Sequence, residues 1–140
     1  MSATVESILS MRLLGHPADR GTDVSATFRY EVRKPFAVET AFHLASTDVV
    51  WTYARDLLLS GLIEHTGQGD VRVWPVIPDP SSGLSPLLRM ELSSPSGHAL
   101  LETDASDINA FLIKTLALCP SGQESTHLNI DAWLESLLRT

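Results

Sequence analysis

The stretch from Val49 to Pro75 changes its hydrophobic period twice, and the other expected elements are arranged around it. Apolar side chains alternate over residues 49–53, which predicts a strand with one apolar face. Residues 54–62 then place their apolar side chains at helical spacing, so a short helix follows. We expect Gly61 to end this helix in the left-handed conformation. Residues 70–76 alternate again and predict a second strand.

The same alternation predicts further strands on both sides of this stretch. They cover residues 4–14, 24–32, 38–44, 88–92 and 98–103. The pattern is clearest in 24–32, which Pro35 ends because proline cannot donate to a ladder. Turns are expected where glycine, proline and serine gather, at residues 15–21, 78–86 and 94–97.

Residues 105–119 predict a helix about 22 Å long. Its main apolar stripe consists of Ala105, Ile108, Phe111, Leu112, Leu116 and Cys119. A second, smaller apolar strip consists of Ala110, Ile113 and Ala117. A helix that is apolar on two sides has two neighbours. Both neighbours lie within the chain, or the smaller strip is a contact with another subunit; the sequence leaves both open.

A last helix is expected to begin at Asn129, a favourable N-cap residue. Leu128 and Trp133 have the spacing of a hydrophobic staple. Its buried stripe would be Ile130, Trp133, Leu134, Leu137 and Leu138. The pattern as a whole indicates one α+β domain over residues 1–140, with antiparallel sheets and about three helices, the C-terminal ones packing at one end. Strand pairs followed by a helix recur in each half, which suggests an approximate internal duplication.

The composition limits the cellular compartment and the class of binding partner that we expect. Cys119 is the one cysteine among 140 residues, which excludes an internal disulfide and indicates a reducing compartment. We find no signal-peptide pattern and no apolar run near the ~18 residues that cross a bilayer, so we expect a cytoplasmic protein. The net charge of −7 argues against nucleic acid or an anionic membrane as partner. Residues 61–140 hold ten acidic and four basic residues. This excess serves solubility or forms an acidic face that steers a basic partner segment.

No pattern of catalytic or metal-binding residues stands out. The histidines are scattered and lack the close spacing of zinc ligands: His16, His43, His65, His98 and His127. Cys119 lies in an apolar stripe, which favours an inert core residue over a nucleophile. Glu102, Asp104 and Asp107 precede or open a helix, where capping and dipole complementation explain them. We therefore expect no enzyme, no metal and no cofactor.

One feature of the short helix points to binding. On a helical wheel Arg55 and Leu59 fall beside the apolar stripe, and Asp56 falls opposite it. Adjacent residues do not face each other on a helix, so Arg55 and Asp56 are not a local salt bridge. Either Arg55 anchors a carbonyl or carboxylate elsewhere in the chain, or Arg55 and Leu59 form a partner contact of the arginine-plus-apolar kind. Arg55, Leu59 and Asp56 are the candidate partner-binding residues.

Three blocks of the chain resemble the SsgA-like family of sporulation and cell-division proteins of actinomycetes. They are VWTYARDLLLSG at residues 50–61, TGQGDVRVWP at 66–75 and LSSPSGHALLE at 92–102. The Phe28-Arg29-Tyr30 strand and the Phe111-Leu112 helix fit in the same order. Within the family the chain most resembles the subgroup linked to positioning the tubulin-like division protein FtsZ.

The resemblance implies a non-enzymatic protein that acts at division septa, with FtsZ and SsgA-type proteins as partners. It also implies a fold similar to plant Whirly proteins, with two antiparallel sheets in a barrel-like domain that assembles as a trimer. This chain is acidic and lacks the Lys-Gly-Lys-Ala-Ala-Leu motif of Whirly proteins, so nucleic-acid binding does not follow from the fold.

Two classes of function are thus in play. The first is a protein-interaction module of the division machinery. The second is a single-stranded nucleic-acid binder that uses a small aromatic and basic patch. That patch would consist of Phe28, Arg29, Tyr30, Arg33 and Lys34.

Overall fold

The computed structural model describes residues 3–15 and 21–126, which form two successive units of four strands and a helix. The first unit contains β1 (Thr4–Leu14), β2 (Thr22–Glu31), β3 (Ala37–His43), β4 (Asp48–Ala54) and α1 (Arg55–Gly61). The second contains β5 (Thr66–Gln68), β6 (Val71–Val76), the 3₁₀ helix η1 (Pro80–Ser82), β7 (Leu87–Ser94), β8 (Gly97–Asp104) and α2 (Ala105–Leu118). The order of elements therefore repeats, as the sequence pattern suggested. The helix expected from Asn129 onward lies outside the described residues.

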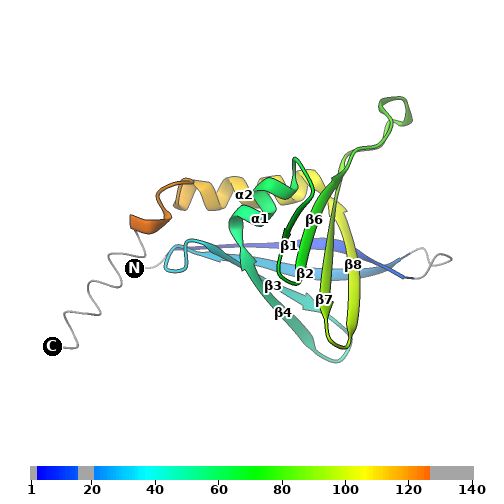
Figure 1. Ribbon diagram of the computed structural model, residues 1–140, viewed down its shortest axis with the longest axis horizontal. Helices are drawn as coiled ribbons and strands as arrows, with labels where there is room; N and C mark the ends of the chain where they lie inside the picture. Colours follow the sequence, from blue (N-terminus) through cyan, green and yellow to red (C-terminus); the bar gives the residue numbers. More distant parts are fainter. Residues whose placement is uncertain (1–2, 16–20, 127–140) are drawn as a thin grey trace.

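The strands form one antiparallel sheet that curls into a half-open barrel (Figure 1). Their order is β4-β3-β2-β1-β8-β7-β6-β5. The predicted α+β class and antiparallel pairing are confirmed, but the prediction of two separate sheets is wrong. The reason is that Arg12–Leu14 of β1 pair with Leu100–Glu102 of β8, so backbone hydrogen bonds join the two units. The edge strands β4 and β5 are not paired with each other.

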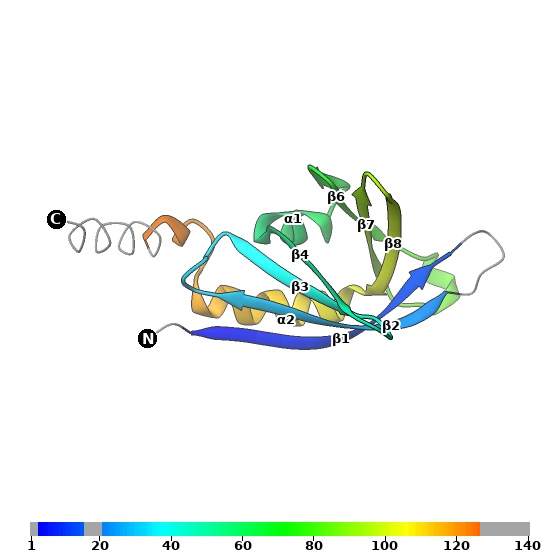
Figure 2. The same cartoon turned by 90° about the horizontal axis from the view of Figure 1, so that it is seen from below.

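The core lies on the inner face of the curled sheet, under α2. Both views show α2 running along β1 (Figure 1, Figure 2). Its buried side chains are Ile108, Phe111, Leu112 and Thr115. The Phe111 ring meets Phe28 of β2 edge to face, with ring centroids 5.6 Å apart, a favourable arrangement for two aromatic rings. The clean alternation predicted for β2 is therefore what places Phe28 and Tyr30 inward.

The short strand β5 is not among the strands predicted from the sequence pattern. Thr66 to Gln68 pair with Val71 to Val73 of β6 across a tight turn. A three-residue strand with a central glycine carries no periodicity and little strand propensity. Its pairing with β6 is decided by the turn and by α1, which packs on both strands.

Gly61 does not end α1 in the way that the sequence predicted. Gly61 is the last residue of α1, and its φ angle is not positive. Leu62 follows as the C-cap residue, with a right-handed backbone conformation. The lack of a side chain at Gly61 matters for packing instead. A Cβ at Gly61 would lie 2.5 Å from Cγ1 and 2.8 Å from Cβ of Val73, a buried residue of β6. Glycine is thus required because α1 touches β6 there.

We predict that Gly61→Ala destabilises the fold, because α1 must move away from β6 to admit the methyl group. The expected loss in unfolding free energy is about 1–3 kcal/mol, measured by urea denaturation. Gly67→Ala is the matched control, since its Cβ would approach no closer than 3.5 Å to Arg72. Equal stability of the two variants would contradict the close approach as the reason for Gly61.

Candidate functional site

The side chain of Arg55, at the start of α1, is fully buried between the two units. Its Nη1 donates to the backbone oxygens of Thr115, at 3.2 Å, and Cys119, at 2.7 Å. The guanidinium also lies over the Tyr30 ring, 4.9 Å from its centroid. The last carbonyls of a helix have no partner within it and carry partial negative charge. Arg55 therefore caps the C-terminal end of α2 from another part of the chain.

The charge of Arg55 is balanced by Glu124, which is also buried. Arg55 Nη2 donates to Glu124 Oε2 at 3.0 Å, and the Gly122 amide donates to Oε1 at 2.7 Å. The pKa of Glu124 lies below its usual range, because the carboxylate accepts hydrogen bonds from the Glu124 backbone N–H, from Arg55 and from Gly122. Burial acts in the opposite direction and raises the pKa. No local sequence pattern predicts this pair, because the two residues are 69 positions apart.

These contacts decide between the two hypotheses for Arg55. It anchors carbonyls and a carboxylate within the chain, and its side chain is not exposed for a partner. The prediction of Arg55 as a partner contact is therefore wrong, because a partner cannot reach the buried guanidinium. Removing Arg55 from its intrachain partners would also leave Glu124 as an unpaired buried charge, which is strongly destabilising. Asp56 is exposed and Leu59 is half-buried against the core, so both stay predictions.

The smaller apolar strip of α2 lies on its outer side. Ala110 and Ala117 are exposed, and 58% of the Ile113 surface is accessible. The described part of the chain does not bury these side chains, whereas the main stripe packs on the sheet. Their assignment to a subunit contact remains a prediction.

The aromatic and basic patch proposed for nucleic acid does not form. Phe28 and Tyr30 are fully buried, so neither ring can stack with a base. Arg29 is paired with Glu6 and Glu31. The period-2 alternation of β2 explains the error, because it sends the two aromatic rings inward and Arg29 outward.

The polar side chains that most resemble catalytic groups lie on the open outer face of the sheet. Thr27 Oγ1 is 2.7 Å from His43 Nε2, and His43 Nδ1 is 2.9 Å from Asp48 Oδ1. An active site also needs a cleft and donors for a developing charge. His43 and Asp48 are instead exposed, and the β2 and β3 backbones around them are paired in the ladder. Among residues 3–15 and 21–126, no group of three or more histidine, cysteine or acidic side chains could hold a metal ion.

The acidic residues near the start of α2 have structural surroundings. Glu102 accepts from Arg89 Nε at 2.9 Å. Asp104 occupies the N-cap position, but its side chain makes no capping hydrogen bond, which differs from the prediction. The amide of Ala105 donates instead to the backbone oxygen of Pro86. Asp107 lies in the first turn, where the helix dipole favours a negative charge.

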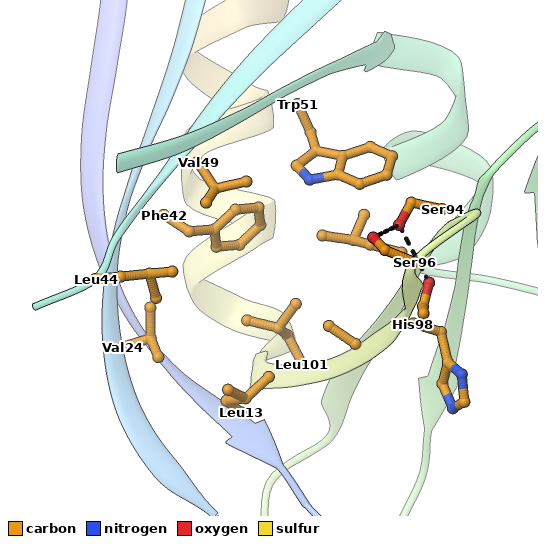
Figure 3. Close-up of a pocket in the computed structure, with 13 residues that line it drawn as sticks. Leu13, Val24, Phe42, Leu44, Val49, Trp51, Ser94, Ser96, His98 and Leu101 are labelled. Carbon is orange, nitrogen blue, oxygen red and sulfur yellow. Dashed lines mark hydrogen bonds between the residues drawn. The ribbon is translucent and has the colours of Figure 1, made fainter. Parts of the chain in front are cut away.

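An apolar groove of about 330 Å³ opens between β2–β4 and the β7–β8 turn (Figure 3). Phe42, Val49 and Trp51 point into it from one side, and Ser94 and Ser96 face them from the other (Figure 3). It is also lined by Leu13, Val24, Leu44, Leu92, Gly97, His98, Ala99 and Leu101. The sequence pattern does not predict this groove, because its walls come from strands of both four-strand units that are distant in sequence. The exposed apolar pair Leu44 and Val49 beside a turn was the available signal.

We predict that Arg55→Met destabilises the protein by about 3–5 kcal/mol, because it removes the buried guanidinium that pairs with Glu124 and donates to the Cys119 oxygen. The double variant with Glu124→Gln should lose less than the sum of the single losses, since no buried charge remains. Urea denaturation measures all three variants. Arg72→Met, at an exposed position of β6, is the control and should change stability by no more than about 0.5 kcal/mol. Additive losses would show that Arg55 and Glu124 do not act as a pair.

Comparison with known proteins places this architecture in a family. Residues 24–124 match the family described as Streptomyces sporulation and cell division protein, SsgA. The chain is 40% identical to the sporulation-specific cell division protein SsgB of Streptomyces coelicolor, over 99% of this chain and 98% of that protein. It is also 40% identical to SsgB of Frankia casuarinae, over 96% and 92% of the two chains.

Solved structures agree with the sequence relatives. An SsgB structure, from work on SsgB mutations that correlate with longitudinal cell division during sporulation of Streptomyces coelicolor, superimposes with a TM-score of 0.82 at 41% identity over 91% of this chain and 97% of that chain. An SsgA-like sporulation-specific cell division protein from Thermobifida fusca YX-ER1 superimposes with a TM-score of 0.87 at 33% identity, over 96% of each chain. In the described part of the chain, no helix has the length and apolar character to cross a bilayer. The chain belongs to the SsgA family of sporulation and cell-division proteins, and the relatives that align over nearly its full length include SsgB proteins.

Proposed function

We propose that this protein helps to position or recruit FtsZ at septum sites through protein–protein contacts, without catalysing a reaction. The observation that carries the proposal is the near full-length 40% identity to SsgB proteins that are named for cell division in sporulation. The role toward FtsZ comes from the resemblance of the three sequence blocks to the family. The same proposal includes the location of the protein, which is the cytoplasm at division septa.

The surface of the molecule supports an interaction role. Large apolar side chains are exposed at several places, including Ile63, Ile77, Ile113 and Val50. The net charge of −7 favours partner segments that carry basic residues, because opposite potentials steer association. Asp56 is exposed at the start of α1 and Leu59 lies one turn later, so they are the candidates for this contact.

Self-assembly is the second part of the proposal. We infer that the strip of Ala110, Ile113 and Ala117 on α2 contacts other copies and that the assembly is a trimer, as the family resemblance implies. Small side chains beside one isoleucine allow a close approach between helices. SsgA-type proteins are proposed as further partners.

We predict that the purified protein binds purified FtsZ in a pull-down assay, tested with and without GTP and over a range of salt concentrations. Asp56→Lys should weaken binding about tenfold by reversing an exposed charge at the contact. Asp70→Lys, in the exposed β5–β6 turn, carries the same charge change and should bind like the wild type. If the unmodified protein fails to bind FtsZ under every condition, recruitment of FtsZ is wrong.

We also predict a mass in solution of three times 15.3 kDa, about 46 kDa, by sedimentation equilibrium. Ile113→Glu should yield monomers, because a carboxylate cannot be buried in an apolar contact without a large cost. Ile63→Glu is the matched control, since this isoleucine is 81% exposed and lies just after α1. A trimer that persists in Ile113→Glu would remove α2 from the interface.

A further inference from the structure

The strand β4 is an edge without the usual protection against pairing. It lies at one end of the strand order, and its seven residues, Asp-Val-Val-Trp-Thr-Tyr-Ala, contain no lysine and no proline. The opposite edge, β5, has only three residues. Soluble proteins normally shorten, charge or cover such edges, because unpaired backbone groups attract another strand. Of the two edges, β4 alone has the length and the apolar character to accept one.

The register identifies which backbone groups of β4 point outward. The amide of Leu44 donates to the Thr47 oxygen at 3.0 Å, and the amide of Arg55 donates to the Phe36 oxygen at 2.7 Å. In an antiparallel pair the bonded positions alternate, so residues 49, 51 and 53 turn their backbone groups toward β3. Val50 and Thr52 therefore direct their N–H and C=O groups away from the sheet. Both residues are exposed, Val50 to 55%.

The side chains of β4 connect this edge to the apolar groove. Val49 and Trp51 alternate with the outward-bonding residues and line the groove from the β4 side (Figure 3). Side chains of an added strand would also alternate between the two faces of the sheet. Every second side chain of such a strand would thus lie over the groove and contact its apolar lining. Main-chain pairing with pockets for alternate side chains is an established mode of peptide recognition.

Charge selects the kind of segment that fits this edge. Asp48 begins β4 and Asp56 follows its end, and both are exposed. A second copy of this chain would bring the same net charge of −7 and the same two acids to the edge. Like charges across an interface disfavour association, and opposite charges favour it. The edge is therefore better matched to a basic partner than to itself.

We propose that β4 receives an extended segment of another protein as a ninth, antiparallel strand, with apolar side chains at alternate positions and lysine or arginine at its ends. The apolar side chains lie in the groove beside Val49 and Trp51, and the basic ends meet Asp48 and Asp56. This inference deepens the proposed interaction function by assigning it a surface and a segment chemistry. Its test uses no FtsZ sequence, so that the two proposals fail separately.

The probe is the capped peptide Lys-Lys-Thr-Leu-Thr-Leu-Thr-Lys-Lys, added to the isotope-labelled full chain. Amide hydrogen exchange is followed by NMR, which reports each backbone N–H separately. We expect exchange of the Val50 and Thr52 amides to slow about tenfold or more at saturation, while the amides of residues 49 and 51, already bonded to β3, change little. A peptide with glutamate in place of lysine should bind about tenfold more weakly at low salt.

Two N-methylated peptides test the backbone pairing without altering the protein. In an antiparallel pair the residue opposite Val50 faces the outer side, so the threonine amides of the peptide point at β4 and the leucine amides point away. Methylation of the threonine amides should abolish binding, and methylation of the leucine amides should preserve it. Loss with the leucine-methylated peptide alone would overturn the antiparallel direction, and equal effects of both would overturn strand addition itself.

Variants of the chain give the complementary test. Val50→Pro removes the outward N–H at an edge position where proline is tolerated and should weaken peptide binding about tenfold or more. Val50→Thr keeps that N–H, changes only the outer side chain and should bind like the wild type. Slow exchange at Val50 and Thr52 that depends on protein concentration alone would mean that a second copy occupies the edge, and the proposal would be wrong. Unchanged exchange with every peptide would equally overturn it.

Discussion

The buried guanidinium of Arg55 holds together parts of the chain that are remote in sequence. Arg55 is the first residue of α1, and its guanidinium lies over the Tyr30 ring of β2. It donates to the backbone oxygens of Thr115 in α2 and of Cys119, the C-cap residue, and it pairs with Glu124 beyond that helix. A buried charge is costly unless it is paired and hydrogen-bonded, and the contacts of Arg55 come from both structural units, with Tyr30 in the first and Thr115 in the second. Among the described residues, Arg55 Nε is the one buried side-chain nitrogen or oxygen atom that has no hydrogen-bond partner. The position of α1 relative to α2 is thereby tied to electrostatics as well as to apolar packing.

The seam between β1 and β8 has a related consequence for the surface. Only the last residues of β1 pair with β8, so the two units meet along a short ladder and then diverge. The sheet curls without closing, which leaves β4 and β5 as edges and opens a groove between β4 and the β7–β8 turn. In a closed barrel the backbone N–H and C=O groups of β4 and β5 would be paired with each other. The half-open form therefore leaves an apolar groove beside the backbone groups of an edge strand.

Several polar residues of the described part of the chain hold the fold together. The buried polar residues among those described make hydrogen bonds within the fold; they are Thr40, Arg55, Glu102, Thr103, Thr115 and Glu124. His43 and its neighbours Thr27 and Asp48 form a hydrogen-bonded chain, but on an open sheet face. The relatives of the protein are named for cell division rather than for a reaction.

The elements whose hydrophobic pattern is local could be predicted from the amino-acid sequence alone. Alternation predicted β1, β2, β3, β4, β6, β7 and β8, and helical spacing predicted α1 and α2. The three sequence blocks predicted the family that the comparison confirms. Periodicity is a property of neighbouring residues, so it survives in the linear chain. The single sheet, the partner of Arg55, the close approach at Gly61 and the groove beside Trp51 were decided by the tertiary structure. Each depends on residues that are distant in sequence, and local patterns carry no information on which distant side chain will meet a buried charge or leave a strand edge open.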